Sequence, residues 1–392
     1  MLVNNIKSDK IYLDNAATTP LDERVLREML PFLHGNYGNP SSIHSFGVFA
    51  KDVLEESRSE LAKLIHCLPE EIVFTSSGTE SNNAAIKGIA FENRSKGNHI
   101  IVSSIEHDCV LNACKWLEDQ GFFITYLPVD SFGIVDIDRL KKYINPKTIL
   151  VSVMHANNEI GTIQPIEEIG KICKEKGVCF HTDACQSFGK IPVNFQSAHL
   201  DLLTLNAHKI NGPKGVGALI IRKGTKIAPL LHGGGQERGW RSSTENIPGI
   251  IGFVKAAQLA IAQLSMEAKK IGRMRDRLEK YILENIDGAY INGHPTLRLH
   301  TNINFSIQGL EGETMRLLLL LDEKGIAVSA GSACSSNNKS SASHVLQAIG
   351  RNQFEARGSI RISLGRYNTE EEVNFFSDTL INSIKTLNPI FS

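Results

Sequence analysis

The sequence predicts an α/β protein with a large domain, built on a mostly parallel sheet sandwiched by helices, and a smaller α+β C-terminal domain. Three observations support this prediction. Short apolar runs rich in β-branched residues alternate with helical segments up to about residue 250. One long helical stretch follows, and after it the order of elements changes. A chain of 392 residues with 42% hydrophobic residues can bury a core of this size.

The large domain is predicted from a series of strand-like runs, several of them followed by a helical segment. The run EEIVFTSS at 70–77 leads into the helical segment 78–97, and the run at 99–108 leads into the helical segment 109–121. The remaining strand-like runs lie at 122–130, 148–159, 178–186, 201–209 and 216–223, with a helical segment at 165–177. Apolar strands that alternate with helices favour a parallel sheet covered on both faces.

The small domain is predicted from a change in this pattern. The stretch 252–286 has apolar residues at helical spacing and no proline, which predicts a long helix that bridges two domains. Strand-like runs follow at 301–308, 326–334 and 358–365, and helices are predicted at 312–325, at 343–350 and at the C-terminus. We place the domains at 1–260 and 261–392, and expect the extreme N-terminus to pack with the small domain.

The charge balance argues against nucleic acid or a membrane as a partner. Lys and Arg together number 42, as do Asp and Glu, so the chain has no net field to attract an anionic polymer or lipid surface. No signal-like apolar segment opens the sequence, and the apolar run within 312–325 is too short to span a bilayer. We expect a soluble, cytoplasmic protein that acts on a small molecule.

Cysteine usage singles out one thiol. The seven cysteines show no CxxC spacing, so we expect neither a metal site nor a disulfide framework. Six lie beside apolar residues and are predicted to be buried: Cys67, Cys109, Cys114, Cys173, Cys179 and Cys185. The seventh, Cys334, lies in SAGSACSSNNKSSAS at 329–343, whose composition predicts an exposed, mobile loop.

Polar residues follow several of the predicted strands. Ser76 to Glu80 open a helical segment and suit either a phosphate or an ordinary helix cap. His107 and Asp183 follow two other strands, where such residues are more often structural than functional. Lys209 follows an apolar strand, although an ammonium group is costly to bury. A lysine, an aspartate and an anion site together indicate pyridoxal phosphate, because this cofactor needs a Schiff-base lysine, a partner for its ring nitrogen and a phosphate site.

A series of motifs then carries a family resemblance along nearly the whole chain. In order they are YLDNAATTP, GNPSSIH, FTSSGTESNN, EHD, MHANNEIGTIQPI, HTDACQS, AHKINGPKGVGAL, HGGGQERG, GSACSS and SIRISLGR. With these motifs the sequence resembles the cysteine desulfurases of the NifS/IscS group, within the class V aminotransferase branch of fold-type I pyridoxal phosphate enzymes. The GSAC context of the cysteine resembles the long-loop subgroup.

The resemblance implies a role for each matching residue. Lys209 would hold the cofactor and move protons at the substrate Cα, Asp183 would pair with the ring nitrogen, and His107 would stack on the ring. Gln186 would hydrogen-bond the phenolic oxygen, and Asn158 would act with Arg361 on the substrate carboxylate. The remaining predicted cofactor-binding residues are placed at the phosphate: Gly78, Thr79, Asn206, His208 and, reaching the neighbouring subunit, Thr244.

The resemblance also implies the reaction and its partners. Cys334 would attack the sulfur of L-cysteine, which leaves alanine and a persulfide on Cys334 for transfer to an acceptor. A mobile loop suits this role because the sulfur has to leave the pocket. A homodimer with shared active sites and an iron–sulfur scaffold or another sulfur acceptor are the implied protein partners.

Two departures from the family pattern, and several rival functions, stay open. Asn206 stands where the family has a serine, and Ser243 stands where it has a glycine, which would strain the backbone if φ is positive there. The loop after Cys334 lacks the Glu-Pro of the family. The alternatives are a selenocysteine lyase or another pyridoxal phosphate lyase or aminotransferase, and a non-enzymatic sulfur-carrier scaffold.

Overall fold

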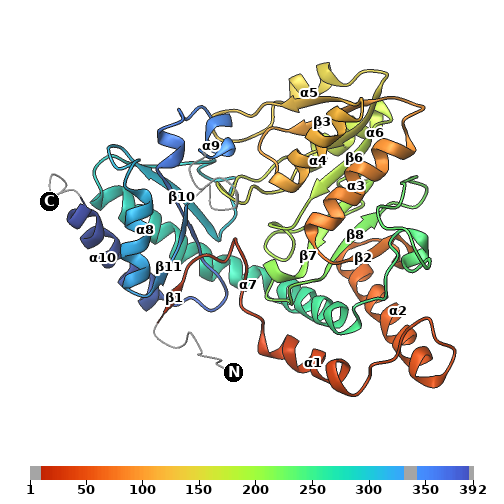
Figure 1. Ribbon diagram of the computed structural model, residues 1–392. Coiled ribbons are helices and arrows are strands. Elements are labelled where there is room, and N and C mark those ends of the chain that lie inside the picture. Colours follow the sequence, from red (N-terminus) through yellow and green to blue (C-terminus); the bar gives the residue numbers. More distant parts are fainter. Residues whose placement is uncertain (1–9, 331–341, 388–392) are drawn as a thin grey trace.

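The computed structural model describes residues 10–330 and 342–387. Its larger part is built on a seven-stranded sheet (Figure 1). The strands in spatial order are β2 (Ile72–Thr75), β8 (Gly217–Ile221), β7 (Leu202–Asn206), β6 (Cys179–Asp183), β5 (Thr148–Ser152), β3 (His99–Ser103) and β4 (Phe123–Leu127). All are parallel except β8, which is antiparallel to both of its neighbours. This confirms the mostly parallel sheet that the sequence predicts.

Helices cover both faces of this sheet. Alternate residues of each strand point to opposite faces, so Ile72 and Phe74 join one hydrophobic core while Val73 joins another. The first core is closed by α1 (Glu23–His34), α2 (Ser45–Ile65), α5 (Ile137–Tyr143), α6 (Ile166–Lys176) and the first half of α7 (Ile247–Asn285). The second is closed by α3 (Gly78–Glu92) and α4 (Asp108–Asp119).

The C-terminal part has its own antiparallel sheet, with the strand order β12 (Ser329–Ala330), β13 (Ser359–Ser363), β10 (Asn302–Ile307) and β9 (Ala289–Ile291). Its core takes side chains from the second half of α7 and from α8 (Thr314–Glu323) and α10 (Glu370–Leu387). The short helix α9 (His344–Ala348) packs in a separate small cluster with Ile105 and Ile160 of the larger part. A smaller domain with its own sheet is thus present, as predicted.

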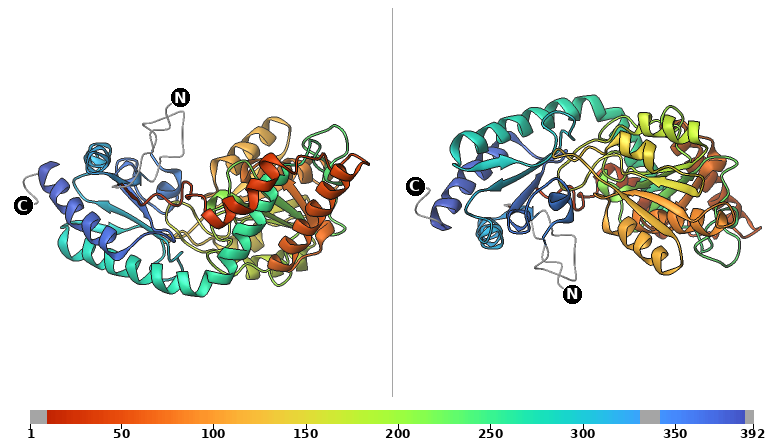
Figure 2. Two further views of the ribbon diagram at one scale, coloured as in Figure 1. Left: turned by 90° about the horizontal axis from the view of Figure 1, so that it is seen from below. Right: turned by 90° about the horizontal axis from the view of Figure 1, so that it is seen from above.

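Two segments join the parts. Helix α7 is 39 residues long and runs from the larger sheet to the smaller one (Figure 2), so the predicted boundary at residue 260 falls within it. Strand β1 (Ile11–Tyr12) pairs in parallel with β11 (Ile326–Ala327), and Leu13 is buried in the core of the smaller part.

Among the described residues, α7 is also the one helix whose length and hydropathy would allow it to cross a membrane. Its N-terminal half supplies Phe253 and Ala257 to one core, and its C-terminal half supplies Met274 and Leu278 to another. These side chains are accounted for by packing within the protein.

The cysteines are less deeply buried than the sequence predicts. Cys114 and Cys173 are buried in the two cores beside the larger sheet. The other four described cysteines are half-buried: Cys67, Cys109, Cys179 and Cys185. All four lie at or beside the end of an element. Cys67 follows α2, Cys109 is the second residue of α4, Cys179 opens β6 and Cys185 follows β6.

Candidate active site

The predicted site residues gather where the parallel strands end. The carboxyl ends of parallel strands meet at one edge of a sheet, and ligands of open α/β sheets bind at that edge. Asp183 is the last residue of β6 and Asn206 the last residue of β7. Lys209 ends the 3-10 turn that follows β7, and Gly78 begins α3, three residues after β2 ends. The edge therefore holds an amine, a carboxylate and a helix N-terminus.

Lys209 is held at this edge by the N-terminal segment of the chain. Its Nζ donates to the carbonyl oxygens of Ala16 at 2.6 Å and Ala17 at 2.7 Å. The same segment is fixed to the strand end because the Thr19 amide and hydroxyl both donate to the carbonyl of His208. The ammonium group is thereby kept partly buried without leaving its donors unpaired.

Asp183 is buried and keeps two specific partners. Oδ2 accepts a hydrogen bond from Nδ2 of Asn82 at 2.7 Å, and Oδ1 accepts one from the backbone N–H of Cys185 at 2.8 Å. Only 5% of the residue is exposed. These donors hold the carboxylate at the strand end, where it can accept from a protonated ring nitrogen.

His107 caps the N-terminus of α4 with its own ring. Nδ1 accepts from the backbone N–H of Cys109 at 3.1 Å and lies 3.1 Å from Sγ of the same residue. Burial lowers the pKa of His107 below its ordinary value, so the ring is neutral at pH 7. Because Nδ1 accepts, the ring proton lies on Nε2, and a neutral ring of this kind can stack on a planar ligand.

The N-terminus of α3 offers free backbone donors. Ser77 caps the helix by accepting from Glu80 N–H through Oγ and from Ser81 N–H through its carbonyl. The N–H groups of Gly78 and Thr79 have no acceptor within the described chain. A Cβ at Gly78 would lie 2.6 Å from Sγ of Cys185 and 3.3 Å from Nδ2 of Asn206, so glycine is needed for the close approach. A phosphate group suits these donors and the helix dipole.

His208 and Gln186 complete this edge. Nδ1 of His208 lies 3.0 Å from the Thr18 hydroxyl, and burial lowers the pKa of His208 to about 4, so the imidazole is neutral. The Gln186 amide donates through Nε2 to the Ala16 carbonyl at 2.9 Å. That carbonyl also accepts from Lys209, which places the amide beside the lysine.

Arg361 reaches the site from the smaller part. It lies on β13, is 1% exposed, and donates to the Asn158 carbonyl at 3.1 Å and to Oδ1 of Asp14 at 2.8 Å. In the sheet it lies opposite Ser329 of β12. The structure thus brings together the two residues predicted to bind a carboxylate, Asn158 and Arg361, and adds Asp14 as a partner.

Two predicted site residues are not joined to this cluster. Cys334 lies outside the described residues, and its predicted role stays a prediction. Thr244 lies exposed in the segment before α7, and its predicted role involves a second copy of the chain. In the same segment Ser243 has a φ of 147°, in the region that favours glycine, as the departure from the family pattern suggested.

Sequence reasoning missed several residues of the site. Asn82 lies one helical turn after Gly78, so a helix that begins at Gly78 puts both residues on one face, but the contact of Asn82 with Asp183 depends on how α3 packs against β6. Glu106 is fully buried and accepts from Met154 N–H, and burial raises its pKa well above the ordinary range. Lys190, four residues after Gln186, donates to Oε1 of Gln186 at 3.1 Å. The sequence offered one signal for Lys190, which is its position four residues after the predicted site residue Gln186.

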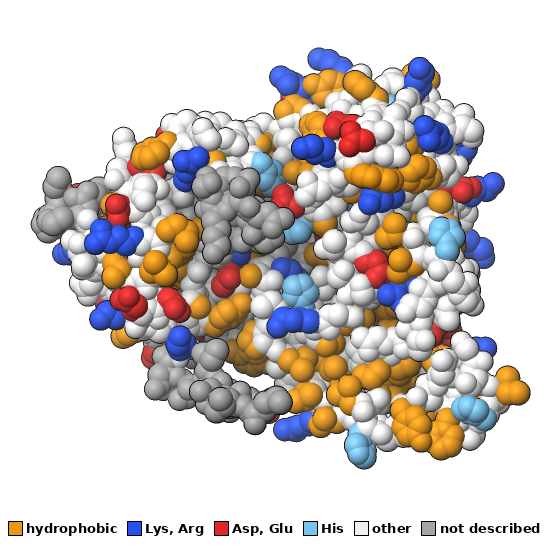
Figure 3. All heavy atoms as spheres, in the orientation of Figure 1, with side chains coloured by type: hydrophobic (Ala, Val, Ile, Leu, Met, Phe, Trp, Pro, Cys, Tyr) orange, Lys and Arg blue, Asp and Glu red, His pale blue; other side chains and the backbone are white. Residues whose placement is uncertain are grey.

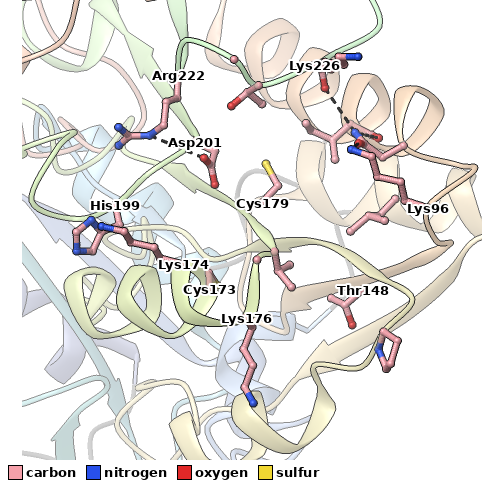
Figure 4. Close-up of a pocket in the computed structure, with 18 of the residues that line it drawn as sticks. Lys96, Thr148, Cys173, Lys174, Lys176, Cys179, His199, Asp201, Arg222 and Lys226 are labelled. Carbon is pink, nitrogen blue, oxygen red and sulfur yellow. Dashed lines mark hydrogen bonds and ion pairs between the residues drawn. The ribbon is translucent and has the colours of Figure 1, made fainter.

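A cavity of about 700 Å³ lies at the opposite edge of the sheet (Figure 4). It is lined by the first residues of two strands, Thr148 and Cys179, and by several cations. The guanidinium of Arg222 turns away from Cys179 and donates to the carbonyls of Leu200 and Phe195. None of the predicted site residues lines this cavity, and Asp183, Asn206 and Lys209 lie at the other edge of the sheet.

Comparison with known proteins identifies the family. The class V aminotransferase family matches residues 11–376. A cysteine desulfurase IscS of Dictyoglomus turgidum is 52% identical over 97% of this chain and 96% of the relative. Among solved structures, a NifS-like protein superposes with a TM-score of 0.90 at 41% identity, covering 96% of this chain and all of that one. A protein named SspA, solved in complex with cysteine, superposes with a TM-score of 0.80 at 38% identity, covering 92% of this chain and all of that one. The chain belongs to the class V aminotransferases and, within them, to the cysteine desulfurases of the IscS and NifS type.

Proposed function

We propose that this chain is a pyridoxal-phosphate-dependent enzyme that converts L-cysteine to alanine and takes up the sulfur on Cys334. The observation that supports this most directly is the meeting of Lys209, Asp183 and the α3 N-terminus at one edge of the sheet, in a chain of this family. A thiol that accepts sulfur distinguishes this reaction from those of a lyase or an aminotransferase, neither of which needs such a carrier.

The residues present fit the proposed cofactor. Lys209 supplies the amine for a Schiff base, Asp183 an acceptor for the ring nitrogen, and Gly78 with Thr79 free N–H donors for the phosphate. Asn206 lies beside the α3 N-terminus, where the family pattern has a serine. Its amide can donate a hydrogen bond as a serine hydroxyl would, so this difference from the family keeps a donor at the phosphate site. Pyridoxal phosphate, when bound, supplies an electron sink that makes the substrate Cα proton acidic.

The chain's own groups then handle the substrate. Arg361, supported by Asp14 and the Asn158 carbonyl, would hold the carboxylate of L-cysteine. Lys209 would take the proton from the substrate Cα and later return a proton to Cα, and Cβ would gain a separate proton, the one released when the Cys334 thiol ionises, as alanine forms. The buried, neutral ring of His107 would cover the face of the cofactor.

The sulfur step is a transfer to a thiolate. The Cys334 thiolate would attack the substrate sulfur, a new S–S bond would form as the Cβ–S bond breaks, and the bonding electrons would pass to Cβ, which is protonated. The products are alanine and a Cys334 persulfide, so no external oxidant is required. Cys334 follows by four residues the end of β12, the strand that pairs with the Arg361 strand.

We further propose a homodimer, an iron–sulfur scaffold or another sulfur acceptor as the physiological partner, and a cytoplasmic location. Support for the homodimer comes from exposed apolar side chains around α1 and the start of α2, which Figure 3 shows gathered at the lower edge of one face. We call these residues the α1–α2 patch: Leu26, Leu30, Leu33, Tyr37, Ile43, Phe46, Val48 and Phe49. A contiguous apolar surface of this kind marks a protein interface.

The test is alanine formation from L-cysteine in the presence of a reductant. We expect the parent to form alanine, Cys334→Ala to form almost none, and Lys209→Ala to lose both turnover and the visible absorption of bound cofactor. Cys67→Ala, which removes a partly buried thiol at the end of α2, is the matched control and should keep full activity. Equal alanine formation by the parent and Cys334→Ala would overturn the role of Cys334 and favour a lyase.

A further inference from the structure

Lys190 contacts the site through Gln186. Its Nζ donates to Oε1 of Gln186 at 3.1 Å, while Nε2 of the same amide donates to the Ala16 carbonyl at 2.9 Å. The Ala16 carbonyl also accepts from Nζ of Lys209 at 2.6 Å. The two lysines are therefore linked by one side-chain amide and one carbonyl.

The chemistry of the donors sets the direction of the amide. An ammonium group has three donors and no acceptor, so it can face only the oxygen of an amide. A backbone carbonyl has no donor, so it can face only the nitrogen. Lys190 and Ala16 thus select the same orientation of Gln186 from its two ends, and Nε2 is the end that lies beside Lys209.

We propose that Lys190 is a positioning residue that fixes the Gln186 amide with its N–H groups toward the cofactor. This inference rests on the function proposed above, in which Gln186 donates to the phenolic oxygen of pyridoxal phosphate. Without Lys190 the amide loses the donor that holds its oxygen. The amide is then held from the Ala16 end alone, and a rotation that presents oxygen, which repels a phenolate and cannot donate to it, becomes easier.

The surroundings of Lys190 show that Gln186 is its principal polar partner. No carboxylate of residues 10–330 or 342–387 forms an ion pair with it, and it borders a small cavity of about 30 Å³ together with Lys209 and His300. Burial, followed by the charges of Lys209 and Arg361, lowers its pKa to about 7, and Cys185 opposes this effect. The neutral amine keeps two N–H donors, so it can still donate to Oε1 of Gln186 above that pH.

The readout is the pH titration of the visible absorption band of the holoenzyme. A donor to the phenolic oxygen stabilises its anionic form, so loss of the donor makes that oxygen more basic and raises the midpoint of the titration. We expect Lys190→Met to raise the midpoint by about one pH unit, since a hydrogen bond to a charged oxygen contributes on that order. Lys190→Arg, which keeps the charge and the donors, should restore a midpoint close to that of the parent.

A double-mutant cycle distinguishes an effect of Lys190 through the Gln186 amide from a direct effect of the charge of Lys190. If Lys190 acts through Gln186, then Lys190→Met should shift the midpoint far less in a Gln186→Ala background than in the parent. Lys115→Met, at an exposed position on α4, is the matched control and should leave the midpoint unchanged. If Lys190→Met does not fold, Lys190→Gln replaces it in the same cycle, with a rise again expected.

The outcomes distinguish this inference from the proposed function. A parent protein without a visible band would overturn the proposed function and the inference with it. A parent with the band, together with a Lys190→Met midpoint equal to that of the parent, would overturn the inference alone. Equal shifts in the presence and absence of the Gln186 amide would show that Lys190 acts by its charge, which also overturns the positioning role.

Discussion

Among the described non-glycine residues with a positive φ, Ser243 departs furthest from the left-handed helical region that side chains can adopt. Its φ is 147°, and the Cβ of any residue other than glycine is crowded by the backbone there. We expect Ser243→Gly to increase the free energy of unfolding by about 1 kcal/mol, because strain of this kind costs about 1–3 kcal/mol and the added freedom of glycine in the unfolded chain offsets part of the gain. Urea unfolding of the two proteins measures the difference.

The matched control for this prediction is Ser243→Ala. It removes the same hydroxyl but keeps Cβ, so it should show no gain in stability. The backbone N–H of Ser243 donates to Oε1 of Gln236 at 3.2 Å, and both variants retain that donor. If Ser243→Ala and Ser243→Gly raise the free energy of unfolding equally, the effect comes from loss of the hydroxyl. That result would contradict backbone strain at Ser243 as the cause.

At the same scale, the sequence predicts those site residues that follow strands. Asp183 and Lys209 stand at the ends of apolar runs, and a parallel sheet brings such ends together whatever the details of packing. Asn82 and Lys190 lie within helical or turn segments, where a polar residue is ordinarily exposed. Their contacts with Asp183 and Gln186 depend on the relative placement of elements, which no local pattern encodes.

Helix α1 is attached to the smaller part through its N-cap. Asp22 caps α1 by accepting from the Arg24 N–H at 2.9 Å, and its other oxygen accepts from Arg366 at 2.8 Å. The Arg24 side chain, followed by the other donors, holds the pKa of Asp22 well below its usual range. One carboxylate therefore fixes both a helix end and a contact between the two parts of the chain.

We expect Asp22→Asn to be less stable than the parent at pH 7 by about 1–3 kcal/mol, the range for a hydrogen bond to a charged group. A carboxyl whose folded pKa is depressed stabilises the protein above its unfolded pKa, near 3.8, and loses that contribution as pH falls through the folded pKa. The difference between Asp22→Asn and the parent should therefore shrink below about pH 4. Thermal unfolding from pH 7 to pH 3 measures it.

Asp119→Asn is the control for that prediction. Asp119 is an exposed carboxylate at the end of α4, so its loss should change stability little at either pH. A difference for Asp22→Asn that stays constant from pH 7 to pH 3 would show that the charge of Asp22 contributes nothing to the contact.

Helices and strands can be predicted where a local periodicity of apolar residues marks them. Strand pairing cannot be predicted in this way where the partners lie far apart in the sequence. The strands of the larger sheet and the helices α3, α4 and α6 follow from their apolar spacing, and so does α7, although it begins at Ile247, ahead of the expected start at 252. The helices α1, α2 and α5 were not predicted. The antiparallel direction of β8 does not follow, because an apolar run reads the same in either direction. The pairing of β1 with β11 joins residues more than 300 positions apart, and neither two-residue strand carries a pattern.

At the scale of the molecule, α7 makes the two parts depend on each other. Its first half completes the core under the larger sheet, and its second half completes the core of the smaller one. Arg361 and Arg366 extend from the smaller part to Asp14 and Asp22 of the N-terminal segment. The site edge is consequently shaped by both parts, and a change in either can reach Lys209 through the segment that holds it.

The α1–α2 patch makes a prediction about assembly. Ile43 is 98% exposed and Phe46 54% exposed, and burying them against a second copy would remove this apolar surface from water. We expect the parent to sediment at twice the mass of one chain, and the double variant Ile43→Lys/Phe46→Lys to sediment as a monomer at micromolar concentration. Leu319→Lys, at a 62% exposed position on α8, is the matched control and should remain a dimer.

The same variant tests whether the sites are shared. If Thr244 completes the phosphate site of the second subunit, the monomeric variant should bind pyridoxal phosphate more weakly than the parent, and Thr244→Ala should weaken binding without changing the sedimented mass. A monomer that binds the cofactor as tightly as the parent would show that each chain holds a complete site. A double variant that still sediments as a dimer would place the interface elsewhere, because two ammonium groups cannot be buried against an apolar partner without a large desolvation cost.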